Sequence, residues 1–223
     1  MAKKTVGVLG LGVFGSTIAK KLGENDFDVI TVDLNMGAVE RIAPYVTQSV
    51  QGDMGDLELL KSIGFDNCDI AVIASGSNLE SSVLAAMNCK KLNIEHVIAK
   101  AKNKVFKEIL IEMGVDEVVR PEKEMGDRVA RNLMRNHIRD VFDLDDEFAV
   151  IEFFPPKNWL GKTLQELDLR REYEINVVGV RQGLNEKMTV NVDPNMIVTK
   201  DTILIALGES EKFEHFDYTH QLK

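Results

Sequence analysis

The residues with the clearest chemical potential are glycines close to the start of the chain: Gly10, Gly12 and Gly15. They follow an apolar run that begins at Thr5, and apolar residues at helical spacing come after them. Glycines at this spacing let a strand turn tightly into a helix, so that backbone amides and the positive end of the helix dipole approach a phosphate. The pattern predicts a nucleotide-phosphate site. The alternative is a glycine turn that only builds the fold.

An acidic residue stands where a nucleotide site needs one. A second apolar strand is expected over residues 29–32, and Asp33 stands at its end, roughly 20 residues beyond the glycine loop. A carboxylate at this place can accept hydrogen bonds from ribose hydroxyls. The context therefore favours a nucleotide site over a simple turn.

Asp53 ends the next expected strand, residues 47–51, and two roles are open to it. It can reach the base or ribose of a ligand, because ligands of open α/β sheets bind at the carboxyl ends of the strands. It can also cap the helix that follows, a role for which Asp56 competes.

Small and basic residues follow two further strands. The strand expected over residues 70–74 ends in Ser75 and Gly76, and a later strand ends at Lys100 and Lys102. Lysines at a strand end can contact phosphate oxygens, although a solvated surface charge is the common role of such a lysine. We expect one of the two to be solvated.

The elements that position these residues alternate between strand and helix. Besides the strands named above, apolar runs end at residues 101 and 119, and helical patterns cover residues 36–43, 57–63, 79–92 and 104–113. Regular alternation of this kind predicts a doubly wound parallel sheet of Rossmann type. We expect it to fill residues 1–121 as a nucleotide-binding domain.

A long amphipathic helix is expected from residue 122 onward. Met125, Val129, Leu133 and Ile138 form an apolar stripe on it, which can dock on a second subunit or pack on its own domain. An acidic break at residues 143–147 follows. Residues 122–146 are therefore predicted to be a crossover and dimerisation helix with a linker.

Residues 147–223 change character and predict a small β-rich α+β domain. Gly, Asn, Asp and Pro turns separate its apolar runs. We expect strands over residues 148–154, 175–181, 187–192 and 202–207, with a short helix over residues 161–169.

Composition excludes several classes of protein. The 223 residues are 44% hydrophobic and 28% charged, as in ordinary globular proteins, and the net charge of -9 argues against a nonspecific nucleic-acid binder. The 2 cysteines, Cys68 and Cys89, are too few for a disulfide framework or a zinc site and fit a reducing cytosol. No apolar stretch approaches the roughly 18 residues of a membrane span, so a membrane role requires a partner.

Catalytic signatures are missing from the sequence. Its 4 histidines are scattered, and neither a nucleophile elbow, a zinc-ligand pair nor a phosphate-transfer motif is present. We therefore expect a site that senses a ligand and no enzyme activity. The alternatives are an NAD-dependent oxidoreductase of small molecules and a purely structural assembly domain with an unused pocket.

An ordered set of motifs resembles the cytosolic regulatory subunits of bacterial Trk/Ktr potassium-uptake systems, which consist of an N-terminal and a C-terminal RCK (TrkA-type) domain. The first domain is matched by GLGVFG at residues 10–15, Asp33, GD at 52–53, KAKN at 100–103, MGVD at 113–116 and PEKEMG at 121–126. The C-terminal domain is matched by DLRREY at 168–173 and INVVGV at 175–180.

The resemblance implies a homodimer that assembles into an octameric ring on the cytoplasmic face of a membrane potassium transporter. ATP, ADP or NAD(H) would occupy the first domain and alter the shape of the ring. The implied site residues are Gly10, Gly12, Val13, Phe14 and Gly15 for the phosphates, Asp33 for the ribose, Asp53 and Met54 for the base, Ser75 and Gly76 for the wall, and Lys100 for the phosphate side. Glu122 would be the acidic residue near the phosphates, with or without a divalent cation such as magnesium or calcium.

Two positions qualify the resemblance. Relatives of the Ktr type often have arginine where Val13 stands, and that arginine contacts the terminal phosphate of ATP. Valine cannot make this contact, which weakens the discrimination of ATP from ADP and favours NAD(H) or AMP-type ligands. Some relatives bind cyclic di-AMP in the C-terminal domain, and Asp168 with Arg170 falls at the matching stretch. Arg170 is alternatively an ordinary surface arginine.

Overall fold

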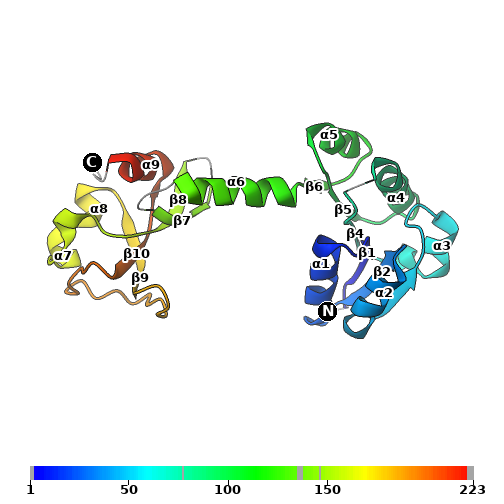
Figure 1. Ribbon diagram of the computed structural model, residues 1–223, viewed down its shortest axis with the longest axis horizontal. Coiled ribbons are helices and arrows are strands. Elements are labelled where there is room, and N and C mark those ends of the chain that lie inside the picture. Colours follow the sequence, from blue (N-terminus) through cyan, green and yellow to red (C-terminus); the bar gives the residue numbers. More distant parts are fainter. Residues whose placement is uncertain (1–2, 77, 135–137, 146, 220–223) are drawn as a thin grey trace. The chain divides into compact units, whose positions relative to one another are not determined.

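A computed structural model describes residues 3–76, 78–134, 138–145 and 147–219. Contacts divide the chain into two compact units, Met1–Glu124 and Met125–Lys223, each with its own sheet (Figure 1). Within the described residues, no helix is both long enough and apolar enough to cross a membrane.

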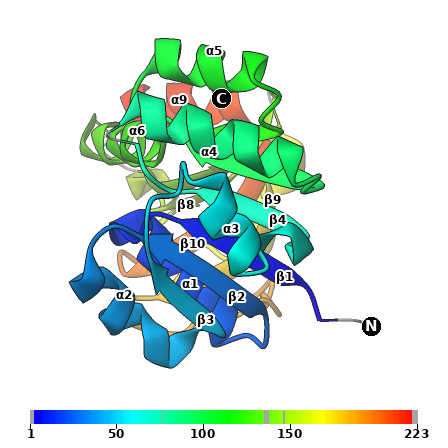
Figure 2. The same cartoon turned by 90° about the vertical axis from the view of Figure 1, so that its right-hand side faces the viewer.

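The N-terminal unit contains a 6-stranded parallel sheet in the order β3-β2-β1-β4-β5-β6. Its strands are β1 (Thr5–Leu9), β2 (Asp28–Asp33), β3 (Gln48–Gln51), β4 (Ile70–Ile73), β5 (His96–Lys100) and β6 (Glu117–Val119). The first four of them are labelled in Figure 2, and β5 and β6 are labelled in Figure 1. The sequence-based prediction of a Rossmann-like sheet is confirmed. The strand order reverses direction between β1 and β4, which is where sheets of this kind bind ligands.

Helices cover both faces of this sheet: α1 (Val13–Gly23), α2 (Met36–Ile42), α3 (Leu57–Ser62), α4 (Leu79–Lys91) and α5 (Lys104–Glu112). Two 3-10 turns, Ala43–Tyr45 and Phe65–Asn67, join helices to strands. Successive residues of β1 point to opposite faces, so Val8 packs with α1 and α2 while Leu9 packs with α3, α4 and α5. This arrangement explains the continuous apolar runs, because the strands are buried on both sides.

The N-termini of these helices differ in whether a side chain caps them. Asn35, Asp56, Asn78 and Asn103 each accept a backbone N–H at the start of α2, α3, α4 and α5, respectively. Among the α-helices that the structure describes between β1 and β6, α1 alone begins without a side-chain cap, because its N-cap is Gly12. The first amides of α1 therefore have no partner within their helix or from a capping side chain.

The C-terminal unit contains a 4-stranded antiparallel sheet in the order β7-β8-β10-β9. Its strands are β7 (Ile138–Asp143), β8 (Phe148–Phe153), β9 (Asn176–Gln182) and β10 (Thr202–Glu209), and its helices are α7 (Leu164–Leu167), α8 (Leu169–Glu172) and α9 (Ser210–Thr219), with a 3-10 turn at Lys157–Trp159. Phe153 contacts Trp159, Phe213 and Phe216 in an aromatic core. The long helix α6 (Pro121–Met134) precedes this sheet in the chain.

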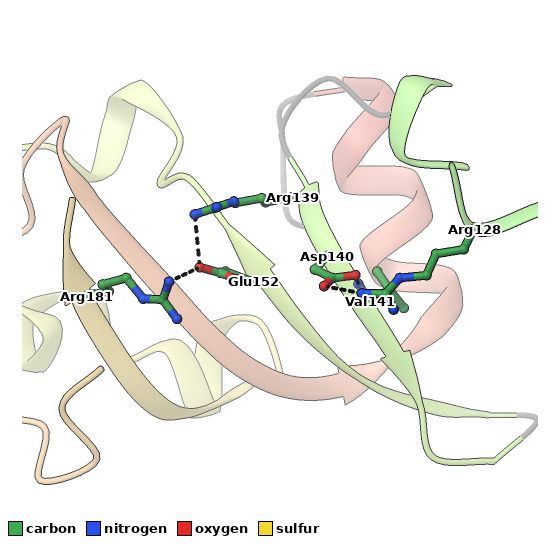
Figure 3. A network of polar contacts seen from close by, with 6 residues as sticks. All are labelled: Arg128, Arg139, Asp140, Val141, Glu152 and Arg181. Atoms are coloured by element: carbon green, nitrogen blue, oxygen red, sulfur yellow. Dashed lines mark hydrogen bonds and ion pairs between the residues drawn. The ribbon is translucent and has the colours of Figure 1, made fainter. Parts of the chain in front are cut away.

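Charged side chains tie the strands of this second sheet together (Figure 3). Oε1 of Glu152 on β8 forms ion pairs with Nη1 of Arg139 on β7 at 3.4 Å and with Nη1 of Arg181 on β9 at 3.6 Å. Arg128 of α6 lies 2.9 Å from Asp140 of β7 and over the ring of Phe142. The contacts of Arg128 hold the middle of α6 to β7.

Three predictions for the second half of the chain are wrong. The stripe of the long helix does not reach Ile138, which begins β7 and is buried in the aromatic core, where Asp217 accepts its backbone N–H at 3.0 Å. Residues 187–192 do not form a strand: Thr189 alone pairs with Val180, and the side chains are exposed except for Val192, which packs against the core, so the segment buries too little to be held in a ladder. The helix expected over residues 161–169 is broken at Asp168, whose φ is +38°.

Gly15 sets how closely α1 packs on the sheet. A Cβ atom there would lie 1.9 Å from the carbonyl oxygen of Gly10 and 2.8 Å from Cβ of Ala74. We expect Gly15→Ala to destabilise the N-terminal unit by about 1–3 kcal/mol or more, because α1 must move away from the loop. The matched control is Gly126→Ala in α6, where a Cβ would meet nothing within 4 Å.

The control change is expected to stabilise the protein by about 0.5–1 kcal/mol, because alanine is the better helix former. Urea denaturation followed by circular dichroism measures both free energies of unfolding. Equal effects of the two substitutions would contradict the close packing of α1.

Candidate functional site

A cleft of about 580 Å³ lies at the carboxyl ends of the parallel strands. It collects residues that are far apart in the sequence, and its lining consists of Gly10, Gly12, Asp33, Ala74, Ser75, Gly76, Lys100, Lys102 and Glu122. A neighbouring hollow of about 310 Å³ shares Gly10, Asp33 and Ser75 and adds Val32, Leu34, Gly52, Asp53, Met54, Asn78 and Ser81. The two hollows are therefore neighbours that share part of their walls.

The glycine loop between β1 and α1 forms one wall of the cleft. Gly10 has a φ of +97°, a conformation that favours glycine, and its N–H donates to the carbonyl of Val32 at 2.8 Å. A Cβ on Gly12 would meet nothing within 4 Å, so the space beside this residue is open to a ligand. Open space beside uncapped helix amides suits an anion such as a phosphate.

Three predicted loop residues do not line the cleft with side chains. Val13 is 89% exposed, Phe14 is half-buried against the core, and Gly15 is buried. Their possible contribution to phosphate binding is limited to the backbone amides at the start of α1. The exposed valine also puts no positive charge near the cleft.

Asp33 lies at the junction of the two hollows and is held at both carboxylate oxygens. Oδ2 accepts the N–H of Leu11 at 2.5 Å, and Oδ1 accepts the N–H of Asn35 at 2.7 Å. Each carboxylate oxygen has two lone pairs, so a ribose hydroxyl can still donate to this group.

The structure separates the two roles considered for Asp53. Asp56 is the N-cap of α3 and accepts the N–H groups of Glu58 and Leu59. Asp53 instead accepts the N–H of Gly55 at 2.8 Å and lines the smaller hollow beside Met54. The acid that follows β3 is therefore not the cap of α3, and it belongs to the lining of the smaller hollow.

An ion pair between Lys100 and Glu122 crosses the larger cleft. The lysine side chain is only 16% exposed, whereas the glutamate is 70% exposed. The hydrogen bond from Lys100 lowers the pKa of the Glu122 carboxyl below its ordinary value of 4.5. Lys102 also lines the cleft but is exposed, so it is the one of the two lysines that fits the expected solvated surface charge.

The side chains that could bind a metal or react are the cysteines, the histidines and clusters of acids. Within the described residues, no group of three or more His, Cys, Asp or Glu side chains could hold a metal ion. Burial raises the pKa of both thiols, Cys68 and Cys89, to about 12. His96 begins β5 and so lies at the edge of the sheet opposite the cleft, and His215 belongs to α9 of the other unit. His137 and His220 lie outside the described residues.

The C-terminal unit has a hollow of about 350 Å³ that includes both residues considered for cyclic di-AMP. Asp168 and Arg170 line it together with Leu164, Gln165, Leu169, Ile175, Asn176, Val177, Val192 and Pro194. Arg171, which the sequence-based list omits, lies 3.7 Å from Asp168. Asp168 has a left-handed backbone and stands between α7 and α8, so that α8, which carries Arg170, begins at the next residue.

Several lining residues escaped the sequence-based list. Asn78 and Ser81 lie at the start of α4, and Leu34 follows Asp33. All belong to segments that follow parallel strands. The feature of the sequence that could have identified these lining residues is therefore their position just after a strand, more than their residue type.

Family models match both parts of the chain: a TrkA-N domain model matches residues 6–121 and a TrkA-C domain model matches residues 150–217. The chain is 31% identical over 215 residues to Ktr system potassium uptake protein C of Bacillus subtilis (strain 168), with 96% of each chain covered. It is 28% identical over 211 residues to Ktr system potassium uptake protein A of Vibrio alginolyticus, with 94% of each covered.

A solved structure described as the GsuK channel bound to NAD has the same fold, with a TM-score of 0.64 and 16% sequence identity. The match covers 94% of this chain and 38% of the channel chain. This chain thus spans well under half of the channel's length.

The Lys100–Glu122 pair predicts a pH-dependent contribution to stability. Glu122→Gln should lower the free energy of unfolding at pH 7 by less than about 1 kcal/mol, because the glutamate is largely exposed. The pKa of this carboxyl is lower in the folded than in the unfolded chain, so the contribution is present above pH 4.5 and is lost as the pH falls through the folded-state pKa.

Urea titrations of both proteins between pH 7 and pH 3.5 test this expectation. Glu58→Gln, which breaks the exposed pair with Lys61, is the control for a general surface-charge effect. A difference between wild type and Glu122→Gln that does not shrink at low pH would contradict the assignment.

Proposed function

Because this chain belongs to the family of proteins that join a TrkA-N domain to a TrkA-C domain, we propose that it is the nucleotide-sensing regulatory subunit of a potassium-uptake transporter. The observation that carries the proposal is the cleft at the carboxyl ends of β1, β2, β4 and β5, where a glycine loop, an acid and two lysines meet. The names of the full-length relatives, potassium uptake proteins, supply the transporter.

The ligand is an adenine nucleotide or dinucleotide: ATP, ADP or NAD(H). Gly10, Gly12 and the first amides of α1 would bind the phosphates, with Lys100 and Lys102 neutralising their charge. Asp33 would accept the ribose hydroxyls. The smaller hollow would take the base beside Asp53 and Met54, and Ser75 with Gly76 would form the wall between.

A cation and a second ligand extend the proposal. A magnesium or calcium ion at Glu122 would take most of its oxygen ligands from the phosphates, because this carboxylate alone cannot complete a coordination sphere. Glu122 would then either give up its ion pair with Lys100 or contact both the cation and Lys100. Cyclic di-AMP would occupy the hollow beside Asp168 and Arg170. The guanidinium of Arg170 can pair with a phosphate of this ligand.

Assembly follows from an exposed apolar stripe on α6. Met125, Val129 and Leu133 are 55%, 50% and 82% exposed, which is unusual for large apolar side chains on a helix this polar. We assign this stripe to a homodimer contact, with dimers forming an octameric ring. The ring would lie in the cytoplasm, on the inner face of the membrane, through its transporter partner.

Each of three segments of the chain has its own role. Residues 1–121 bind the nucleotide, residues 122–146 form the crossover and dimer contact, and residues 147–223 bind the second ligand. The subunit has no catalytic role: the nucleotide acts by binding one conformation of the ring more tightly than another. An NAD-dependent oxidoreductase would need a substrate and an acid or base beside the nicotinamide.

A thermal-shift panel tests nucleotide sensing. ATP, ADP, NAD and NADH at about 100 times their dissociation constants should each raise the melting temperature by roughly 5–10 °C. ATP and ADP should act similarly, because Val13 offers no charge to a terminal phosphate. GTP serves as the control for the base. No shift with any adenine ligand would overturn the proposal, and steady hydride transfer by the NAD complex would favour the oxidoreductase.

Purification of the tagged chain from native membranes tests the transporter role. The expected result is a complex with an integral membrane protein that transports potassium in vesicles, and nucleotide addition changes the rate of transport. A variant in which Val129 and Leu133 of the α6 stripe are changed to serine should bind nucleotide but fail to form the ring. Recovery of the wild-type ring without any membrane protein would contradict a regulatory subunit.

A further inference from the structure

Asp33 has a structural connection that ribose binding does not require. Its Oδ2 accepts the N–H of Leu11, the residue between the two glycines of the loop, at 2.5 Å. The neighbouring Oδ1 accepts the N–H of Asn35, which itself caps α2. The carboxylate therefore joins the end of β2, the start of α2 and the glycine loop through contacts within the protein itself.

Leu11 depends on this carboxylate because it is buried. Its side chain packs in the core with α1, and the residue is 4% exposed. Its carbonyl accepts the hydroxyl of Ser16 at 2.7 Å, and its N–H is satisfied by Asp33. Without Asp33 the buried N–H would lose its partner, which is costly enough to move the loop.

The loop is anchored at Gly10, whose N–H donates to the Val32 carbonyl at 2.8 Å, so movement of Leu11 would be taken up on its Gly12 side. Glycine has the largest conformational freedom of any residue. A Cβ at Gly12 would meet nothing within 4 Å, so there is room for the loop to shift there. A displaced Leu11 would therefore displace the N-cap of α1 and the amides available to a phosphate.

We propose that Asp33 is a positioning residue of the phosphate loop: by holding the Leu11 amide it sets the geometry in which the loop and the start of α1 bind phosphate. The inference rests on the proposed nucleotide site and adds a role that is independent of the ribose. One carboxylate thus couples the phosphate and ribose halves of the ligand site.

The two possible roles of Asp33 predict opposite effects on a ligand without a ribose. If the carboxylate acts on ribose alone, its removal takes a negative charge away from the cleft, and a ribose-free anion should bind equally or more tightly. If it positions the loop, its removal should weaken that anion despite the lost repulsion. Inorganic pyrophosphate is a suitable probe because it contains only the phosphate part.

The experiment compares wild type, Asp33→Ala and Asp69→Ala by calorimetric titration with pyrophosphate and with ADP. Asp69 is a matched control: its Oδ2 accepts the N–H of Thr5 at 2.8 Å, at the opposite end of β1 from the cleft. We expect Asp33→Ala to weaken pyrophosphate about tenfold and ADP by more. Asp69→Ala should leave both dissociation constants within about twofold of wild type.

Pyrophosphate affinity that is unchanged or improved in Asp33→Ala, with ADP weakened, would overturn the inference and leave the nucleotide site standing. Binding of neither probe to wild type would instead overturn the proposed function. If Asp33→Ala does not fold, Asp33→Asn, which keeps one acceptor oxygen, replaces it, and a smaller loss of pyrophosphate affinity is expected.

Amide hydrogen exchange gives a second readout that does not depend on ligand affinity. The Leu11 amide should exchange at least about tenfold faster in Asp33→Ala than in Asp69→Ala, because its hydrogen bond is gone. Equal exchange rates at Leu11 in the two variants would also overturn the positioning role.

Discussion

The close approach of α1 to the loop after β1 is the constraint on which the nucleotide cleft depends. It is possible because Gly15 has no side chain where the carbonyl of Gly10 lies. It fixes the start of α1 at the carboxyl edge of the sheet, with Gly12 as a cap that offers no side chain. The amides that a capping residue satisfies in α2 to α5 are thereby left without a side-chain cap in α1, so the proposed phosphate site is a consequence of packing.

The larger hollow is lined by two carboxylates and two lysines, and this has consequences for the proposed binding of a phosphate. Lys100 is mostly buried and paired with Glu122, which belongs to the first turn of α6. An arriving phosphate would compete with Glu122 for Lys100 or require a cation between the two anions. Either event alters a contact of the helix that begins at the cleft. A ligand can shift the conformation of an assembly only through such differences in contact between states.

Much of the fold was predictable from sequence because its signals are local. Buried parallel strands appear as apolar runs, and polar caps or glycines mark the helix ends between them. The second half was predicted less well where local patterns misled. Ile138 continues an apolar spacing that is helical in sequence, yet its burial against the aromatic core makes it the start of β7. Residues 187–192 alternate like a strand but find only one bridge to β9.

The sequence by itself determined the glycine loop and the acids at the strand ends, because turn chemistry and residue spacing are written within short segments. It also indicated the family through its ordered motifs. Only the tertiary structure decided which of these groups meet: that Asp33 holds the Leu11 amide, that Glu122 pairs with Lys100, and that Lys102 shares the cleft. These partners lie on different elements, and the order of strands in the sheet, which no local pattern encodes, brings them together.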